Sequence, residues 1–220
     1  MLLARVNSRE PALFRYKYSV IISNNQEYLL NILSADMSNL LDCNEQILAI
    51  ASKMIRQLPK EKYNHVERPY FESCLGRHMR HIVDHYLCFI RDVDSGVINY
   101  EKRQRDTQIE TDKDYALRII DSIRHFFEEA MRNSVQDASL SVLLCNDVNL
   151  PEGEATQSSV RRELQFLHGH SVHHYALIAT MLRFYGISTD RELGVAPSTL
   201  LYEKTEKKHP EYEKTAKVSA

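Results

Sequence analysis

Glycine and proline are scarce in this chain of 220 residues, with six of each. Because these residues form most tight turns, their scarcity favours long helices with few turns between them. No apolar run reaches the length of a transmembrane helix. The N-terminus has too short an apolar stretch before its first charges to be a signal peptide. The sequence therefore predicts a cytoplasmic protein that does not span a membrane.

Charge of one sign is also lacking, since the formal net charge is only −2. A nucleic-acid or membrane-surface partner is therefore not expected. The sequence has no Gly-rich phosphate loop, nucleophile elbow or Cys-x-x-Cys pair, which disfavours nucleotide-dependent chemistry and serine hydrolysis. The cysteines show no close pairing and are expected to be free thiols in a reducing compartment. They are Cys43, Cys74, Cys88 and Cys145.

Apolar residues recur with helical spacing in four segments. These segments are residues 25–58, 71–94, 114–136 and 158–185. Pro59, Gly96 and Gly186 predict the ends of the first, second and fourth helices. Ser158 or Ser159 is the expected N-cap of the fourth helix.

Four long helices with polar connections predict an all-α protein of one domain, folded as a four-helix bundle. The expected bundle covers residues 25–190, between an N-terminal arm of residues 1–24 and a charged C-terminal tail of residues 191–220. The tail has few apolar residues with which to order itself. Residues 97–112 read as a polar connection, and residues 140–148 are β-prone and predict a short strand or hairpin.

Seven of the ten histidines lie in two of these helical segments. His78, His81 and His85 share roughly one face of the second helix. On the fourth helix His170 precedes His173 by three residues and His174 by four, and either pair could chelate a metal. A third histidine from a facing helix could complete the site. The spacing predicts a metal site without selecting its ligands, and a polar core without metal in an interaction module is the alternative.

Two motifs carry a family resemblance. The first is Ser-Cys-Leu-Gly-Arg-His-Met-Arg-His-Ile-Val-Asp-His at residues 73–85, and the second is Arg-Glu-Leu-Gln-Phe-Leu-His-Gly-His-Ser-Val-His-His-Tyr-Ala-Leu-Ile at residues 162–178. Together they resemble the DinB/YfiT-like superfamily, whose members are four-helix bundles that hold a divalent metal with three histidines. The resemblance covers roughly residues 25–190.

The resemblance implies a ligand set of His81, His170 and His174. His81 stands in the His-x-x-Asp context of the first ligand, and His174 is the second member of a His-His pair that begins with His173. Many relatives continue His-His-Arg-Gly-Gln, whereas this chain continues His-His-Tyr-Ala-Leu. The substrate and mechanism of better-known members therefore do not transfer, and no catalytic residue is assigned.

Zinc or nickel is the expected ion, although nitrogen ligands also suit iron or copper. Asp84 and Glu163 are candidates to orient the imidazoles. The alternative is that they are solvated or bridge to Arg80 or Arg162. Further pocket candidates are His78, His85 and His173.

The resemblance implies a metal-dependent transferase or hydrolase that acts on an unknown small molecule, such as a low-molecular-weight thiol. Cys74 and Cys88 are interpreted as small buried fillers. The Arg-rich loop at residues 101–106 is a candidate anion-binding segment. The alternative is a non-catalytic metal- or ligand-binding bundle, related to stress, in which His78 or His85 fills the open position of the ion. A homodimer is expected in either case.

Overall fold

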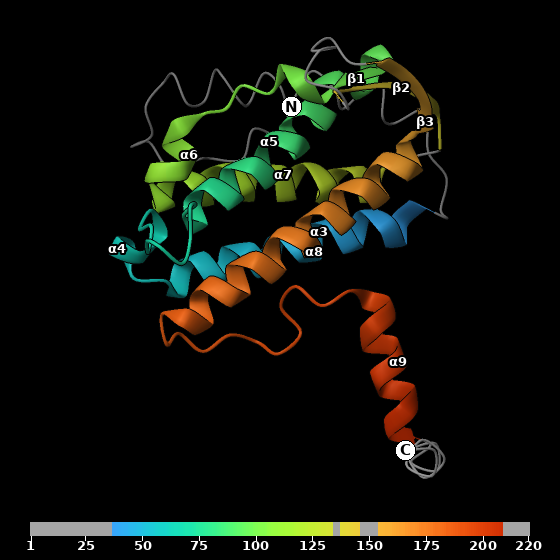
Figure 1. Ribbon diagram of the computed structural model, residues 1–220. Coiled ribbons are helices and arrows are strands. Elements are labelled where there is room, and N and C mark those ends of the chain that lie inside the picture. Colours follow the sequence, from blue (N-terminus) through green and yellow to red (C-terminus); the bar gives the residue numbers. More distant parts are fainter. Residues whose placement is uncertain (1–36, 134–136, 146–153, 209–220) are drawn as a thin grey trace. The chain divides into compact units, whose positions relative to one another are not determined.

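The computed structural model describes residues 37–133, 137–145 and 154–208 (Figure 1). The predicted arm, the first part of the first predicted helix and the end of the predicted tail lie outside the described residues. The chain divides into two compact units, Met1–His168 and Gly169–Ala220.

Four long helices dominate the structure, which confirms the prediction of an all-α bundle. They are α3 (Ser38–Gln57), α5 (Leu75–Asp92), α7 (Lys113–Arg132) and α8 (Val160–Phe184). The boundary between the two units falls within α8, and the helix continues through it without a break. The first unit also holds the short helices α4 (Lys60–Tyr63) and α6 (Thr107–Thr111) and the 3-10 turns η2 (Val93–Ser95) and η3 (Tyr100–Lys102).

The helix ends follow the signals in the sequence. Helix α3 stops before the extended residue Leu58 and Pro59. Gly96 and Gly186 both adopt the positive φ of 71° that favours glycine after a helix. The Ser159 hydroxyl accepts a hydrogen bond from the Arg162 N–H at 3.3 Å and so caps α8 as predicted.

Helix α5 begins at Leu75, four residues later than the predicted start at Phe71. Cys74 is the N-cap, and its sulfur accepts the Arg77 N–H at 3.4 Å. The apolar ring of Phe71 fits the helical pattern but lies in the preceding loop, which explains the early predicted start.

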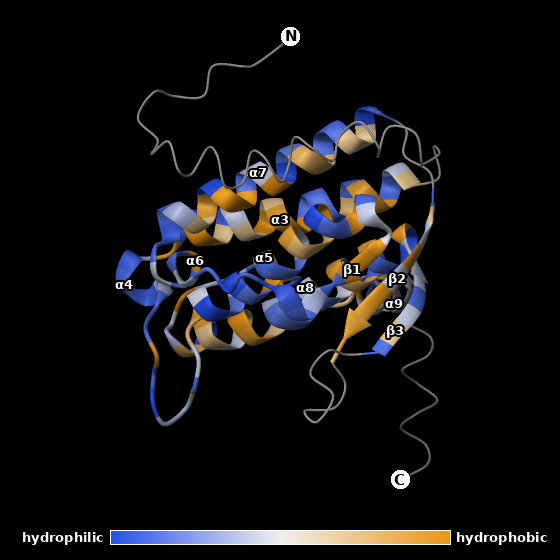
Figure 2. Cartoon of the chain, turned by 90° about the horizontal axis from the view of Figure 1, so that it is seen from above, coloured by the Kyte–Doolittle hydropathy of each residue, from blue (hydrophilic) through white to orange (hydrophobic). Residues whose placement is uncertain are grey.

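The core of the first unit forms where α3 packs along α7 and where α5 contacts α6 and α7. Figure 2 shows hydrophobic and hydrophilic positions alternating along these helices. One polar side chain, Asn44, is fully buried among them. The Tyr86 hydroxyl donates to Asn44 Oδ1 at 2.8 Å, and Asn44 Nδ2 donates to the carbonyls of Leu40 and Leu164 at 2.8 and 3.2 Å. The amide therefore joins α3, α5 and the first part of α8.

A small three-stranded sheet completes the first unit. Strand β1 (Val97–Asn99) pairs in parallel with β2 (Ser139–Leu144), which pairs in antiparallel fashion with β3 (Glu154–Ser159). Figure 2 shows that β2 is hydrophobic and β3 hydrophilic. The short strand predicted within residues 140–148 is confirmed as β2, while its antiparallel partner β3 lies beyond the predicted stretch. Residues 146–148 lie outside the described residues.

The prediction of a plain polar connection at residues 97–112 is wrong. This stretch contains β1, η3 and α6. Ile98 and Ile109 are fully buried within it. Each element is too short for a periodic apolar pattern, and β1 is stabilised by pairing with a strand some 40 residues later.

The second unit contains the rest of α8 and helix α9 (Pro197–Lys208). Part of the predicted charged tail is therefore helical. Gly194 has a φ of 77°, and a Cβ there would lie 2.2 Å from the Ala176 nitrogen. Among all described residues, no helix combines the length and the apolar character needed to cross a membrane.

Gly76 allows α6 to approach α5 at backbone distance. A Cβ at this position would lie 2.0 Å from the carbonyl oxygen of Glu110, a backbone atom that cannot rotate away. We expect Gly76→Ala to destabilise the protein by about 1–3 kcal/mol, measured by urea unfolding. Gly169→Ala is the matched control, because a Cβ there meets nothing within 4 Å and alanine favours the helix by about 1 kcal/mol. Equal effects of the two substitutions would contradict this account of the α5–α6 contact.

Ionisation of the Asp94 carboxyl makes the free energy of unfolding depend on pH. Burial raises the pKa of its carboxyl from 3.8 to about 6, and Oδ1 has no hydrogen-bond partner among the described residues. The native state therefore binds a proton more tightly than the unfolded state, so ionisation of Asp94 costs stability as the pH rises. Asp94→Asn should stabilise the protein at about pH 8, by at most about 1 kcal/mol because the group is partly exposed. The gain should disappear near pH 4, and a gain that is constant across urea titrations at both pH values would refute the assignment.

Candidate metal centre

Two imidazoles lie on consecutive turns of α5. His81 and His85 are four residues apart and therefore lie on one face of the helix. Their ring centroids are 4.5 Å apart, and the ring planes are nearly perpendicular at 79°. His81 is half-buried and His85 is buried, with only 3% of its surface exposed. His78 is half-buried one turn earlier on the helix.

The hydrogen bonds of His85 define its tautomer. Nδ1 lies 2.7 Å from the carbonyl oxygen of His81. A carbonyl only accepts, so Nδ1 carries the proton and Nε2 of the neutral ring carries the lone pair. Nη1 of Arg103 lies 3.4 Å from Nε2 and donates toward it. The rings of Tyr100 and Phe166 flank His85, with centroids at 5.3 and 6.0 Å.

Helix α8 carries the second group of imidazoles. The ring centroids of His170 and His174 are 4.6 Å apart, and those of His173 and His174 are 5.1 Å apart. His170 and His174 are half-buried, whereas His173 is exposed. Burial lowers the pKa of the nearby His168, which favours its neutral form.

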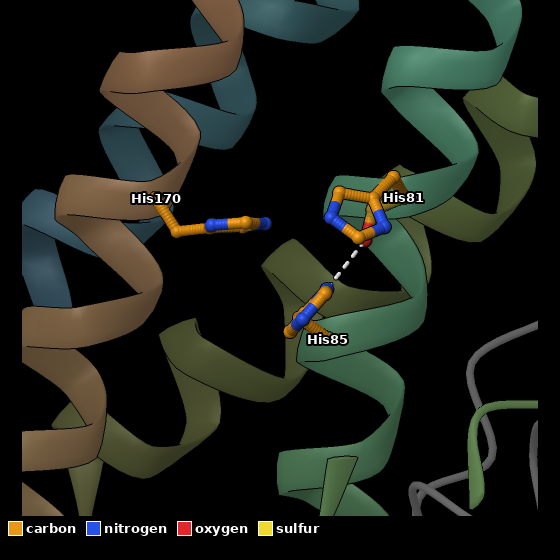
Figure 3. A group of neighbouring side chains, drawn as sticks. All are labelled: His81, His85 and His170. Atoms are coloured by element: carbon orange, nitrogen blue, oxygen red, sulfur yellow. Dashed lines mark hydrogen bonds between the residues drawn. The ribbon is translucent and has the colours of Figure 1, made fainter. Parts of the chain in front are cut away.

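Among the described residues, His81, His85 and His170 form a group that could hold a metal ion. One ring nitrogen of each lies within 4.8 Å of the others. Figure 3 shows the three rings, with the bond from His85 to the His81 carbonyl dashed. Nitrogens that share a tetrahedral zinc ion lie roughly 3.3 Å apart, at Zn–N bonds of about 2.0 Å. Small ring rotations would therefore bring this donor set to a common ion.

Of the three predicted ligands, His81 and His170 belong to this group and His174 does not. The ring of His174 nevertheless lies next to that of His170. His85, predicted only as a pocket residue, occupies the third place in the group.

Asp84 lies on the same helix and is buried. Its carboxylate faces the Arg80 guanidinium, with Oδ2 4.0 Å from Nε. Arg80 also binds Glu110 at 2.8 Å through Nη1. Burial raises the pKa of Asp84 to about 6, against the opposing effect of Arg80 and Arg103. Asp84 thus pairs with Arg80, the second of the two roles considered for it.

Glu163 is buried at the start of α8 and accepts two hydrogen bonds. The donors are the Tyr100 hydroxyl at 2.9 Å and the Ser158 hydroxyl at 2.5 Å. Because the Tyr100 ring flanks His85, Glu163 fixes one wall around that imidazole. Burial and the Glu163 carboxylate raise the pKa of Tyr100 well above its usual value, so the phenol stays protonated as a donor.

The sequence analysis missed the roles of Tyr100, Arg103 and Phe166 around His85. Tyr100 and Arg103 lie in the stretch read as a polar connection, where only the run of arginines gave a signal. Phe166 fits the apolar pattern of α8 and so resembles an ordinary core residue. Tyr100 meets its carboxylate partner 63 residues away, a contact that helical periodicity does not reveal.

The cysteines show no sign of a nucleophile. The cysteines at 43, 74, 88 and 145 are all free thiols. Cys88 is buried, and burial raises the pKa of its thiol to about 11, so it stays protonated at neutral pH. Cys74 is the buried N-cap of α5. Both agree with the interpretation as buried fillers.

Comparisons with known proteins identify the family of the chain. The model of the DinB family matches residues 33–209. FK506-binding protein 5 of Rhizopus delemar is 36% identical to the chain over 104 residues, which is 47% of the chain and 27% of that protein. The chain therefore spans only about a quarter of this relative's length. No solved structure gives a significant match. The family match covers well over half of the chain and includes both histidine-bearing helices, α5 and α8. The chain therefore belongs to the DinB family.

Proposed function

We propose that this DinB-family protein holds a divalent metal ion through His81, His170 and His174 and uses it to activate a low-molecular-weight thiol. The observation that carries the proposal is the convergence of imidazole nitrogens from α5 and α8 within 4.8 Å. A metal ion shared by several neutral imidazoles would accept one nitrogen lone pair from each ring.

His174 is a better third ligand than His85 for an electrostatic reason. Nδ1 of His85 already donates to a carbonyl, so only Nε2 could bind an ion. The Arg103 guanidinium faces that nitrogen at 3.4 Å, and a dication bound there would meet a like charge. The His174 ring lies beside the His170 ring on α8. We therefore assign His85 to the wall of the site.

Three neutral imidazoles leave the full charge of the ion and at least one open position, at which a bound thiol loses its proton near neutral pH. Around it, Tyr100 and Phe166 supply apolar surface that limits access of water. Glu163 holds the Tyr100 ring in place through its hydroxyl. The function that fits these parts is transfer of the thiol sulfur to an electrophile, and hydrolysis is the second reaction class.

Zinc or nickel is the proposed ion, since all-nitrogen sites accept both, and iron or copper would also fit. The place of His85 beside His81 and His170 favours one specific alternative, a non-catalytic bundle in which His85 fills the open position. A cytoplasmic homodimer remains part of the proposal, and none of the described contacts bears on it.

Metal binding can be tested by elemental analysis of the purified full chain. We expect about one equivalent of a transition metal per chain in the wild type. His81→Ala and His170→Ala should each lower the affinity by at least roughly 100-fold, because loss of an outer partner alone costs roughly 10- to 100-fold. His125→Ala is the matched control, since this exposed histidine on α7 only pairs with Glu128 and Glu129. If His81→Ala and His170→Ala bind metal as tightly as the wild type and the His125→Ala control do, the proposed centre does not exist.

The choice between His174 and His85 has its own test. His174→Gln should lower metal affinity as strongly as His170→Ala, whereas His85→Gln should retain most of it, because glutamine removes only a wall residue. Competition with a chromophoric chelator measures both affinities. The reverse order would show that His85 is the third ligand and would support the saturated, non-catalytic alternative. Turnover across a panel of thiols and electrophiles then tests catalysis, with His170→Ala as the inactive reference.

A further inference from the structure

We infer that Arg103 is the carboxylate-binding residue of this site, so that the ligand is a small thiol that also carries a carboxylate. The inference rests on the proposed function and names the substrate class. Its evidence comes from the first compact unit, where Arg103, His85, Tyr100 and Phe166 surround one another.

Arg103 is the half-buried cation nearest to the imidazoles of α5. Its one hydrogen bond with a side chain or backbone group of the described residues is the 3.4 Å contact with His85 Nε2. That distance exceeds the usual 2.7–3.2 Å range, so the bond is weak. A guanidinium has five N–H donors in a planar fork, and this contact uses one of them. Most of the binding capacity of Arg103 therefore faces no protein acceptor.

Neighbouring arginines on α5 are bound differently. Arg77 and Arg80 bind Glu110 at 3.2 and 2.8 Å, and Arg91 binds Asp92 at 2.6 Å. In the part of the chain that the structure describes, Arg103 forms no ion pair with a carboxylate. Placing an unpaired guanidinium in a half-buried position is costly, unless a ligand supplies the missing anion.

The carboxylates near Arg103 are already engaged by other donors. Asp84 faces Arg80, and Glu163 accepts from Tyr100 and Ser158. Asp106 accepts from the Tyr115 hydroxyl at 3.0 Å and from the Gln108 N–H at 3.1 Å. Glu101 accepts from the Cys145 N–H at 3.1 Å. Asp84 lies close enough for the charge of Arg103 to lower its pKa, but no ion pair joins the two side chains, and the other three carboxylates accept from donors of their own.

Two further arginines add positive charge, Arg162 at the Phe166 ring and Arg105 close enough to Asp84 to lower its pKa. Arg162 lies over the Phe166 ring, with its guanidinium carbon 5.9 Å from the centroid. Arg105 is exposed two residues after Arg103, with a φ of 49°. Like Arg103, neither forms an ion pair among the described residues. These charges would attract an anion, while the planar fork of Arg103 suits the two coplanar oxygens of a carboxylate.

The position of Arg103 relative to His85 links this carboxylate to the imidazole group. The Arg103 fork lies beside Nε2 of His85, and a ring nitrogen of His85 lies within 4.8 Å of one of His81, the proposed ligand on the same helix. A ligand with its sulfur at the open position of the ion would need only a short carbon chain to reach Arg103. On binding, the carboxylate would replace the weak contact with His85 as the acceptor of the guanidinium N–H groups.

The inference can be tested with two three-carbon thiols, 3-mercaptopropionate, which ends in a carboxylate, and 3-mercapto-1-propanol, which ends in a neutral hydroxyl. The full chain is loaded with Co²⁺, and the sulfur-to-cobalt absorption band reports binding of each thiol, without any need for turnover. We expect the wild type to bind the carboxylate thiol at least roughly tenfold more tightly, as charge-assisted hydrogen bonds predict. Arg103→Gln should remove this preference and leave the affinity for the neutral thiol unchanged.

Two further variants control for charge and folding. Arg103→Lys keeps the charge without the planar fork and should retain part of the preference. Arg132→Gln removes an exposed arginine at the end of α7 and should retain all of it. Circular dichroism melting establishes that each variant is folded. If Arg103→Gln does not fold, the Arg103→Lys variant tests the inference instead. A preference for the carboxylate thiol equal to that of the wild type would then argue against recognition by the planar guanidinium.

The possible failures are distinguishable. A wild type that binds both thiols equally, or an Arg103→Gln variant that keeps the preference, overturns the carboxylate subsite and leaves the proposed metal function intact. A protein that gives no sulfur-to-cobalt band with either thiol overturns the proposed function and this inference together.

Discussion

The buried amide of Asn44 is the contact on which the rest of the first unit depends. It accepts from Tyr86 on α5 and donates to the Leu164 carbonyl on α8, so one side chain fixes the two histidine-bearing helices to α3. An amide has a defined donor side and acceptor side, and burial makes an unmatched partner costly by about 1–3 kcal/mol. Apolar packing alone would tolerate a rotated or shifted α8, whereas this set of bonds does not. The positions of His85 and Phe166 relative to each other follow from it.

A second constraint is which of the arginines near α5 have a carboxylate partner within the protein. The close approach at Gly76 brings the short helix α6 against α5, and Glu110 on α6 then binds both Arg77 and Arg80. Both guanidinium groups at the start of the helix therefore form ion pairs within the protein. The cation beside His85 is Arg103, which comes from the segment after α5 and forms no ion pair among the described residues. The paired arginines of α5 therefore differ from Arg103, for which we propose a role in ligand binding.

Much of the fold could be predicted from the sequence, because long amphipathic helices carry a regular apolar pattern and clear end signals such as Pro59 and Gly186. The errors have physical reasons. Elements of three to five residues, such as β1 and α6, are stabilised by distant partners rather than by local propensity. At the site, helical spacing placed His81 and His85 on one face, yet it could not choose between them, since residues three and four apart point the same way. That choice depends on Arg103 and on the His81 carbonyl, which are tertiary and backbone contacts.

The junction between β3 and α8 has a geometric consequence. Ser159 is both the last residue of β3 and the cap of α8, and the next residue, Val160, donates its N–H to the Ala138 carbonyl. The register of β3 in the sheet therefore also sets the rotation of α8 about its own axis. A single residue inserted between the strand and the helix would turn every side chain of α8 by about 100°. The β2–β3 pairing therefore acts on α8 through the single junction at Ser159.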